Sequence, residues 1–357
     1  MSFFDIFCLL FWTLSAFAAS VPSVKRQSAW PAPEPCTGNC TFIHDPAVIR
    51  ADDGTYYRLS TNGNIAIATA PDLTGPWEYQ GAMLPEGSSI TLIDKQEMWA
   101  PDVYRYDGTY YCFYSVSNLG LQNSSIGVAT SPTMEFGTWV DHGAVNIPLD
   151  PRWNIIDGNL FNYGPDEPWY FNFGSAWDTV FQTQLTPESG FIDQPEGIEP
   201  SQMLYNSTFP VGGNKVSITE GAYLFWWPSE DIDYHYMFFS SGACCNKAFN
   251  GGEGDWPAPG DEYKVMVCRS ESPSGPFVDM DGRDCVSEDG GSLVLGSHDN
   301  IYAPGGQGVF YESDSGRVVM YYHYVDLNLP TGYLYEEFLF GFNYLDFSSG
   351  WPVVVPK

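Results

Sequence analysis

The sequence predicts an all-β protein, a five-bladed β-propeller, from its composition and from a strand pattern that recurs along the chain. Aromatic residues make up 17% of the 357 residues, and the chain holds 36 Gly and 27 Pro but only 16% charged residues. Such a composition suits many short strands joined by tight turns, and it is not that of a disordered chain. No segment shows helical periodicity of useful length.

The recurring pattern begins with a turn that leads into an aromatic strand. Residues 53–57 (Asp-Gly-Thr-Tyr-Tyr) recur at 107–111, and looser copies lie at 167–171, 233–237 and 315–324. We count five units of four strands, which begin near residues 42, 97, 154, 216 and 300. Four-stranded units at this spacing predict propeller blades, whereas a β-sandwich would not produce the repetition.

The N-terminal region indicates a secreted protein. Residues 1–19 predict a signal peptide, because their apolar stretch is short for a bilayer span and ends in a small-x-small cleavage pattern. An uncleaved anchor is the alternative. Residues 20–41 are predicted to be a short propeptide or leading segment, and residues 42–357 the propeller. Three sequons predict a glycoprotein, at Asn39, Asn123 and Asn206.

The cysteines outside the signal peptide also fit an oxidising compartment. Seven remain there, so at least one is unpaired. A Cys36–Cys40 bridge would close a short loop, and a Cys268–Cys285 bridge would close a hairpin-sized one. Cys112 lies in an apolar run and is predicted to be a buried thiol. The adjacent pair at 244–245 is predicted to form a strained vicinal bridge or to pair elsewhere.

The charge and hydropathy limit the classes of partner. The formal net charge is −30, which argues against nucleic acid because phosphate binding needs clustered Lys and Arg. No stretch after the signal peptide is long and apolar enough to span a membrane. We expect a monomer, because a propeller closes on itself.

Acidic residues stand at the starts of three of the five units. The first strand of each propeller blade lines the central channel, so Asp45, Asp157 and Glu220 are expected to converge on one axis. Read alone, Asp45 before a proline is typical of a turn. Carboxylates in apolar inner strands are costly unless they are paired or functional. Two carboxylates that flank a sugar bond are what glycoside hydrolysis requires.

Several motifs, together and in order, resemble glycoside hydrolase family 43, in particular its endo-α-1,5-L-arabinanase branch, over about residues 43–347. They are His44-Asp45-Pro46, Trp99-Ala100-Pro101-Asp102-Val103, Asp157 after two isoleucines, Glu220-Gly221, Cys244-Cys245, and Arg269-Ser270 leading to Gly275-Pro276-Phe277. The resemblance implies a catalytic propeller that inverts the anomeric carbon. It also implies a general base at Asp45, a general acid at Glu220, and at Asp157 a residue that orients this acid and tunes its pKa.

Four further residues are candidates for contact with the sugar. Sugar rings stack on aromatic faces, so Trp99 and Trp177 are candidate platforms, and packing in the core is the alternative for each. His44 is expected either to contact sugar or to pack. Gln307 is a fourth candidate, because it follows the position where many relatives carry a channel histidine.

That histidine position departs from the family pattern. The matching residue here is Gly306, whereas in many relatives the histidine lies beside a calcium or other ion in the channel. An amide such as Gln307 is a different ligand from an imidazole. We therefore assign no metal ligands and no required cofactor, and a calcium or other channel ion is left open.

The sequence thus predicts a secreted enzyme that hydrolyses arabinan in plant cell-wall pectin. An α-L-arabinofuranosidase or β-xylosidase of the same family is the alternative within the enzymes. A catalytically weak, carbohydrate-binding propeller is the alternative from another class, and the missing histidine favours it while the three carboxylates argue against it.

Overall fold

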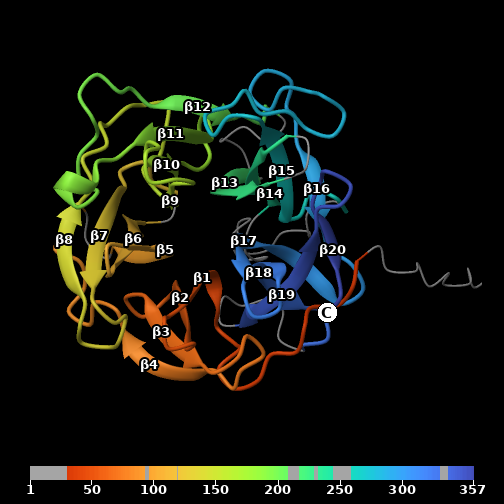
Figure 1. Cartoon of the computed structure of the whole chain (residues 1–357), viewed down its shortest axis with the longest axis horizontal. Coiled ribbons are helices and arrows are strands. Elements are labelled where there is room, and N and C mark those ends of the chain that lie inside the picture. The colour runs from red at the N-terminus through yellow and green to blue at the C-terminus, as the bar shows by residue number, and fades with distance from the viewer. Residues whose placement is uncertain are drawn as a thin grey trace, which may run out of the picture.

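Five four-stranded sheets stand around a central axis in the computed structural model, as the repeats predict (Figure 1). The structure describes residues 30–92, 96–118, 120–207, 217–228, 232–243, 259–329 and 337–357. The predicted signal peptide at 1–19 and the cysteine pair at 244–245 lie outside these residues. Within the described part no helix is long and apolar enough to cross a membrane.

Each sheet is one blade, and its strands pair antiparallel in the order of the chain. Blades one and two consist of β1 (His44–Arg50), β2 (Tyr56–Thr61), β3 (Ala66–Ala70), β4 (Glu78–Ala82), β5 (Glu97–Tyr106), β6 (Thr109–Ser117), β7 (Ser125–Ser131) and β8 (Val140–Ala144). Blade three consists of β9 (Asn159–Phe161), β10 (Tyr170–Phe173), β11 (Val180–Gln184) and β12 (Ser201–Leu204), with the 3-10 helix η1 (Pro187–Ser189) between the last two.

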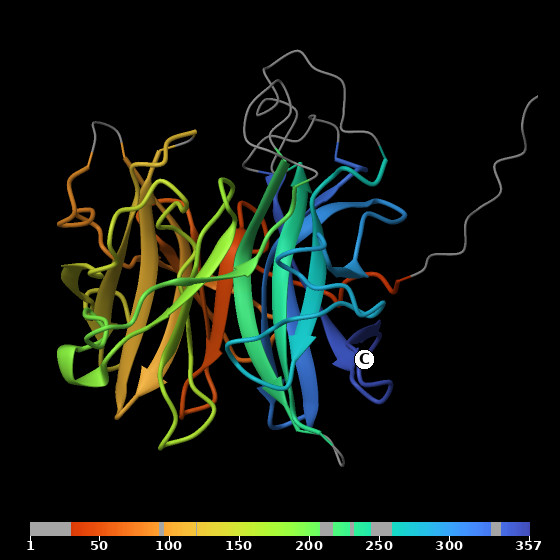
Figure 2. The same cartoon turned by 90° about the horizontal axis from the view of Figure 1, so that it is seen from above.

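Blades four and five complete the ring. They consist of β13 (Ser217–Trp227), β14 (Tyr234–Ala243), β15 (Lys264–Ser270), β16 (Ser292–Leu295), β17 (Ile301–Glu312), β18 (Arg317–Asp326), β19 (Leu339–Asp346) and β20 (Val353–Val355). The first strand of each blade is innermost, since β1, β5, β9, β13 and β17 contact one another around the axis. Figure 2, turned by 90° from Figure 1, shows strands running through the thickness of the ring.

Aromatic and aliphatic side chains from neighbouring blades form the core. One cluster joins blades one and two, a second joins blades two and three, and others join the remaining neighbours. Blade five closes directly on blade one, where β1 contacts β17, β18 and β19. The leading segment 30–41 runs along this closure, with Glu34 N–H donating to the Phe342 carbonyl and Trp77 N–H to that of Thr37.

The predicted cysteine chemistry is confirmed within the described residues. Disulfides join Cys36 to Cys40 and Cys268 to Cys285. Cys112 is a free and buried thiol, as its apolar context predicts.

The inner strands carry irregularities that re-aim residues toward the axis. The pairing of β1, β5, β13 and β17 with their neighbours shifts near the channel. At each shift one residue has a left-handed backbone, and blade three has such a residue just before β9. A bulge of this kind leaves a backbone N–H free of the ladder and turns a side chain out of its usual direction. These residues are Asp45 (φ 42°), Ala100 (φ 44°), Asp157 (φ 58°), Gly221 (φ 61°) and, at the two shifts of β17, Ala303 (φ 51°) and Gly306 (φ 58°).

Candidate active site

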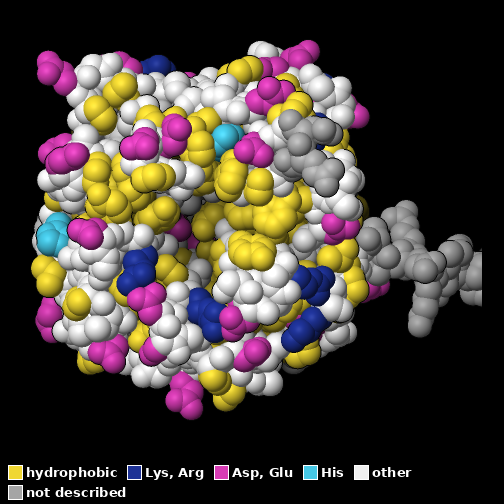
Figure 3. Space-filling model, viewed as in Figure 1, with side chains coloured by type: hydrophobic (Ala, Val, Ile, Leu, Met, Phe, Trp, Pro, Cys, Tyr) yellow, Lys and Arg dark blue, Asp and Glu magenta, His cyan; other side chains and the backbone are white. Residues whose placement is uncertain are grey.

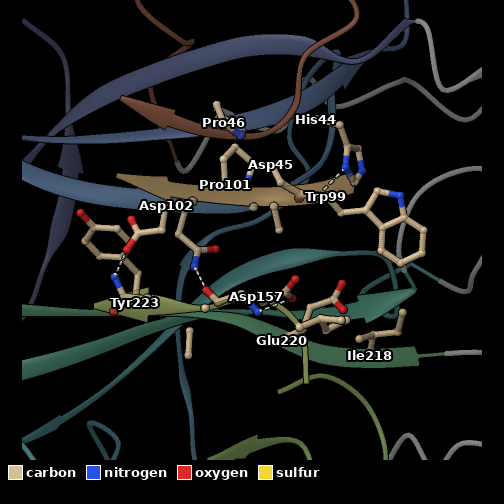
Figure 4. A pocket seen from close by; sticks show the side chains of 18 of the residues that line it. His44, Asp45, Pro46, Trp99, Pro101, Asp102, Asp157, Ile218, Glu220 and Tyr223 are labelled. Carbon is tan, nitrogen blue, oxygen red and sulfur yellow. Dashed lines mark hydrogen bonds and ion pairs between the residues drawn. The ribbon is translucent and has the colours of Figure 1, made fainter. Parts of the chain in front are cut away.

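A cavity of about 570 Å³ lies on the propeller axis and is lined by residues from the inner end of every blade. Seen down the axis, hydrophobic side chains gather around a hollow at the centre of the ring (Figure 3). Figure 4 shows Asp45 and Trp99 on one side of the cavity and Asp157 and Glu220 on the other. The fold thus brings together the three predicted carboxylates, which stand far apart in sequence.

Six of the seven predicted site residues line this cavity: His44, Asp45, Trp99, Asp157, Glu220 and Gln307. Trp177 stays a predicted platform, but it does not line the cavity. The reason is that it lies in the connection between β10 and β11 rather than on an inner strand, with a left-handed backbone and a partly buried side chain.

Asp45 is held as a carboxylate by its neighbours. Nδ1 of His44 donates to Oδ2 of Asp45 at 2.7 Å, and the Thr61 hydroxyl donates to the same oxygen at 3.2 Å. Burial alone would raise the pKa of Asp45, but the charge of His44 and its hydrogen bond to the carboxylate lower it well below its usual range. Asp45 is therefore ionised, which is the state that a general base requires.

His323, on β18, is a site residue that the sequence reasoning did not single out. Its Nδ1 accepts the backbone N–H of Asp45 at 3.0 Å, and its ring stacks on His44 with 4.1 Å between centroids. Because Nδ1 is an acceptor in that bond, we ascribe the low pKa of Asp45 mainly to His44. Burial and the nearby His44 lower the pKa of His323 to about 4, so its ring is neutral at neutral pH.

Steric crowding explains why position 306, where the family resemblance implies a histidine, is a glycine in this chain. A Cβ at Gly306 would lie 2.4 Å from Oδ1 of Asp45 and 2.7 Å from Nδ1 of His323. A side chain at this position would therefore collide with the carboxylate and with the imidazole that anchors it. In this chain the imidazole that lies against position 306 is that of His323, from the second strand of blade five.

Glu220 sits in a different environment from Asp45. Its side chain is partly buried, and it accepts hydrogen bonds from the Ser175 hydroxyl at 2.5 Å and the Tyr263 hydroxyl at 2.8 Å. Burial raises its pKa and the charge of Asp45 raises it further, while the two hydroxyls act in the opposite direction. The net effect is a carboxyl group that holds its proton to higher pH than an ordinary glutamate.

Asp157 lies beside Glu220 and competes with it for protons. Its own N–H donates to the Ser115 hydroxyl at 2.9 Å, and its Oδ2 accepts the N–H of Gly221 at 3.1 Å. Burial, then Glu220 and Asp45, raise the pKa of Asp157 well above its usual value. The bond to Gly221 ties Asp157 to the residue that follows the predicted acid, so the two carboxyl groups are positioned by the same backbone.

Asp102 also lines the cavity, and its contacts are structural. Its Oδ2 accepts the N–H of Leu160 at 3.1 Å and the side-chain amide of Asn159 at 3.2 Å. Burial raises the pKa of Asp102 to about 7, and these hydrogen bonds limit the rise. Asp102 thus joins the inner strands of blades two and three.

The two remaining predicted sugar contacts differ from each other. Trp99 stands at the cavity wall, and its indole N–H donates to Glu97 at 2.9 Å, which orients the ring. Gln307 is buried, its Nε2 donates to the Gly221 carbonyl, and its Oε1 accepts from Ser240. The amide of Gln307 is therefore engaged in joining blades four and five, and its role in sugar binding stays a prediction.

Among the described residues one group of donors is close enough to share an ion: His44, Asp45 and His323, whose ligand atoms lie within 4.8 Å of one another. Calcium takes six to eight oxygen ligands, whereas this group offers two imidazole nitrogens and one carboxylate. Both imidazoles also use Nδ1 in bonds to Asp45. These side chains do not fit calcium.

The fold and the carboxylate-lined axial cavity are those of a glycoside hydrolase propeller. The family model for glycosyl hydrolases family 43 matches residues 40–340, and the chain belongs to that family. Arabinan endo-1,5-alpha-L-arabinosidase A of Aspergillus aculeatus is 45% identical over 341 residues, which cover 94% of this chain and 98% of that protein. The protein of the same name from Aspergillus niger is 44% identical over 342 residues, with the same coverage.

Solved structures agree with this assignment. The alpha-L-arabinanase of Cellvibrio cellulosa, in complex with arabinohexaose, aligns with a TM-score of 0.73 at 25% identity, covering 89% of this chain and 96% of that one. A family 43 endo-arabinanase from Bacillus licheniformis aligns with a TM-score of 0.70 at 25% identity, covering 89% and 99%.

Proposed function

We propose that the protein is a secreted endo-α-1,5-L-arabinanase that hydrolyses arabinan in plant cell-wall pectin with inversion at the anomeric carbon. The observation that carries the proposal is the pairing, in one axial cavity, of an ionised Asp45 with a Glu220 whose pKa is raised above its usual value by burial. The names and near-complete coverage of the fungal relatives support arabinan as the substrate.

In this mechanism Asp45 removes a proton from the water that attacks the anomeric carbon. The His44 imidazole and the Thr61 hydroxyl both donate to Oδ2, so they orient the carboxylate. Because Oδ1 makes no such bond to these two donors, Oδ1 is the oxygen that we assign to the water. The water oxygen bonds to the anomeric carbon as its proton passes to Asp45.

Glu220 gives its proton to the glycosidic oxygen as the bond from that oxygen to the anomeric carbon breaks. The leaving sugar departs with a hydroxyl group, and Glu220 is left as a carboxylate. Transfer of the proton from Asp45 back to Glu220 through solvent restores both groups. Asp157 supports this cycle by its bond to Gly221, which positions the acid.

Secretion, glycosylation, a monomeric state and the propeptide are parts of the same proposal. The two disulfides support an oxidising compartment, where such bridges persist. Intact-mass analysis of secreted protein, before and after deglycosylation, tests the mature N-terminus and the sequons, and light scattering tests the monomer.

Product analysis on linear arabinan, branched arabinan and xylan tests the activity. We expect short arabinose oligomers from linear arabinan, and NMR of the first product is expected to show the inverted anomer. Glu220→Gln and Asp45→Asn are each expected to lower kcat by about 10²–10⁴-fold. Glu78→Gln, on the exposed part of β4, is the matched control and should keep full activity.

Other products would contradict the proposal in distinct ways. Release of arabinose or xylose alone would identify an exo-acting arabinofuranosidase or a xylosidase. Binding of arabinan without turnover, unchanged by Glu220→Gln, would identify a carbohydrate-binding propeller. Retention of the anomer would make Asp45 a nucleophile.

A further inference from the structure

Two hydroxyl groups from different blades hold the carboxyl group of Glu220. Ser175 is the second residue after β10, in blade three, and its hydroxyl donates to Oε2 at 2.5 Å. The Tyr263 hydroxyl, from the residue before β15 in blade four, donates to Oε1 at 2.8 Å. Each carboxyl oxygen therefore has its own partner, and neither partner is itself a carboxylate or a cation.

The Tyr263 ring is rigidly placed. Tyr263 is 2% exposed, and its ring lies parallel to that of His323 at 6.0 Å between centroids. Blade five leaves room for it at Gly305, where a Cβ would lie only 2.1 Å from the ring. The backbone N–H of Tyr263 is bonded to the Ala243 carbonyl at 3.0 Å, which fixes the start of the strand. This tyrosine cannot swing away from Glu220 without displacing blade five.

The two hydroxyls differ in what they can do when Glu220 changes its protonation state. Tyr263 can donate to Oε1 in both states, because Oε1 is the carbonyl oxygen when the proton is on Oε2. Ser175 can accept from a protonated Oε2 and, after rotation about its C–O bond, donate to an ionised Oε2. Ser175 can therefore follow the proton, whereas Tyr263 serves as a fixed donor.

We propose that Ser175 and Tyr263 are positioning residues for acid catalysis, which act through Glu220 and stabilise the charge that develops on it as the glycosidic bond breaks. The proposal rests on the assignment of Glu220 as the general acid. The proton leaves Oε2 for the glycosidic oxygen, and the electron pair of the broken O–H bond stays on Oε2. The Ser175 hydroxyl donates to that oxygen and the Tyr263 hydroxyl to the other, so each oxygen of the developing carboxylate has its own donor.

Substrates with good leaving groups separate this role from a structural one. A nitrophenolate departs without a proton, so a loss of acid catalysis matters little for a nitrophenyl α-1,5-arabinobioside. We expect Ser175→Ala and Tyr263→Phe to lower kcat on linear arabinan about tenfold or more and to change kcat on the aryl substrate about twofold or less. Tyr114→Phe is the matched control, since this buried hydroxyl bonds to Asp141 at 2.6 Å away from the cavity.

The pH profile gives a second readout. Tyr263 donates a bond that favours the carboxylate, so its removal is expected to move the alkaline midpoint of kcat on arabinan to higher pH, by about one unit. Equal losses on both substrates together with an unshifted midpoint, in variants that fold as the wild type does, would overturn the proposal. If Tyr263→Phe does not fold, Ser175→Ala tests the proposal, because it removes only a single oxygen atom. The comparison of kcat on arabinan with kcat on the aryl substrate then decides alone.

Failure of the proposed function would be recognised separately. If the wild type hydrolyses neither substrate, the activity is wrong, and the positioning of Glu220 is then tested by carboxyl 13C NMR titration, with Glu220→Gln to assign the signal. A Glu220 pKa that rises in Tyr263→Phe supports the two hydroxyls as donors to the carboxylate, and an unchanged pKa refutes them.

Discussion

Substitution of Gly306 by alanine is expected to remove most of the activity while leaving the fold nearly intact. Gly306 lies on β17 with a left-handed backbone at φ 58°, beside the proposed base. An added Cβ would lie 2.4 Å from Oδ1 of Asp45, about 1 Å closer than ordinary contact allows. His323, on the other side, is completely buried and cannot move to make room, so Asp45 has to shift.

Gly306→Ala is expected to have two effects: a loss of stability from the left-handed backbone and a loss of kcat from the contact with Asp45. An alanine in a left-handed conformation costs about 1–2 kcal/mol, which lowers Tm by about 2–4 °C in a domain of this size. A displacement of about 1 Å in a catalytic group can cost about 10²-fold in kcat. We therefore expect Gly306→Ala to lose about two orders of magnitude in kcat on linear arabinan with a small change in Tm.

Gly63→Ala is the matched control for the loss of stability that a left-handed alanine causes. Gly63 has φ 50°, and a Cβ there meets nothing within 4 Å. The Tm of Gly63→Ala is expected to fall as much as that of Gly306→Ala, whereas its kcat is expected to stay unchanged. Wild-type kcat in Gly306→Ala would refute the steric reasoning, and so would an equal loss of kcat in the two variants.

Three further predictions concern other parts of the molecule. Burial lowers the pKa of His235 to about 4, so its contribution to stability is complete above pH 6.5 and is lost as the pH falls toward 4. His235→Phe should remove this dependence, and urea unfolding at pH 5 and pH 7 is expected to show about 2 kcal/mol less acid destabilisation than in the wild type. Replacing both Cys268 and Cys285 by serine, at a separation of 17 residues, should cost about 3 kcal/mol in urea unfolding, against about 2 kcal/mol for the pair Cys36 and Cys40. Trp99→Ala should raise KM for arabinan up to about tenfold, whereas Trp177→Ala, outside the cavity lining, should not.

The sequence predicted the blades and the three carboxylates because both follow from the repeats. A repeat places the start of each unit at the axis, so Asp45, Asp157 and Glu220 could be expected to meet. The partners of these carboxylates could not be predicted in this way. His323 lies within the second strand of blade five and Tyr263 just before the third strand of blade four, and they reach the site because neighbouring blades pack side by side.

Aligning the ends of the second strands would have given part of the missing signal. In four of the contacts between consecutive blades, a side chain there accepts the N–H of the next blade's left-handed residue. The pairs are Thr61 with Ala100, Ser115 with Asp157, Ser240 with Gly306, and His323 with Asp45. Three of these acceptors are hydroxyls, so the histidine stands out as the exception, and it is the one that lies against the proposed base.

The contact between blades three and four departs from this arrangement, and the departure accounts for the layout of the acid site. Ser175 occupies the position of the acceptor, yet its hydroxyl bonds to the Glu220 carboxyl. The N–H of Gly221, which would otherwise lack a partner, is accepted by Asp157 instead. Asp157 thus takes over a bond that a serine makes elsewhere in the ring, and Ser175 becomes available to the acid. An Asp157 variant should therefore weaken the junction of two blades as well as the activity, whereas a Ser175 variant should affect the activity alone.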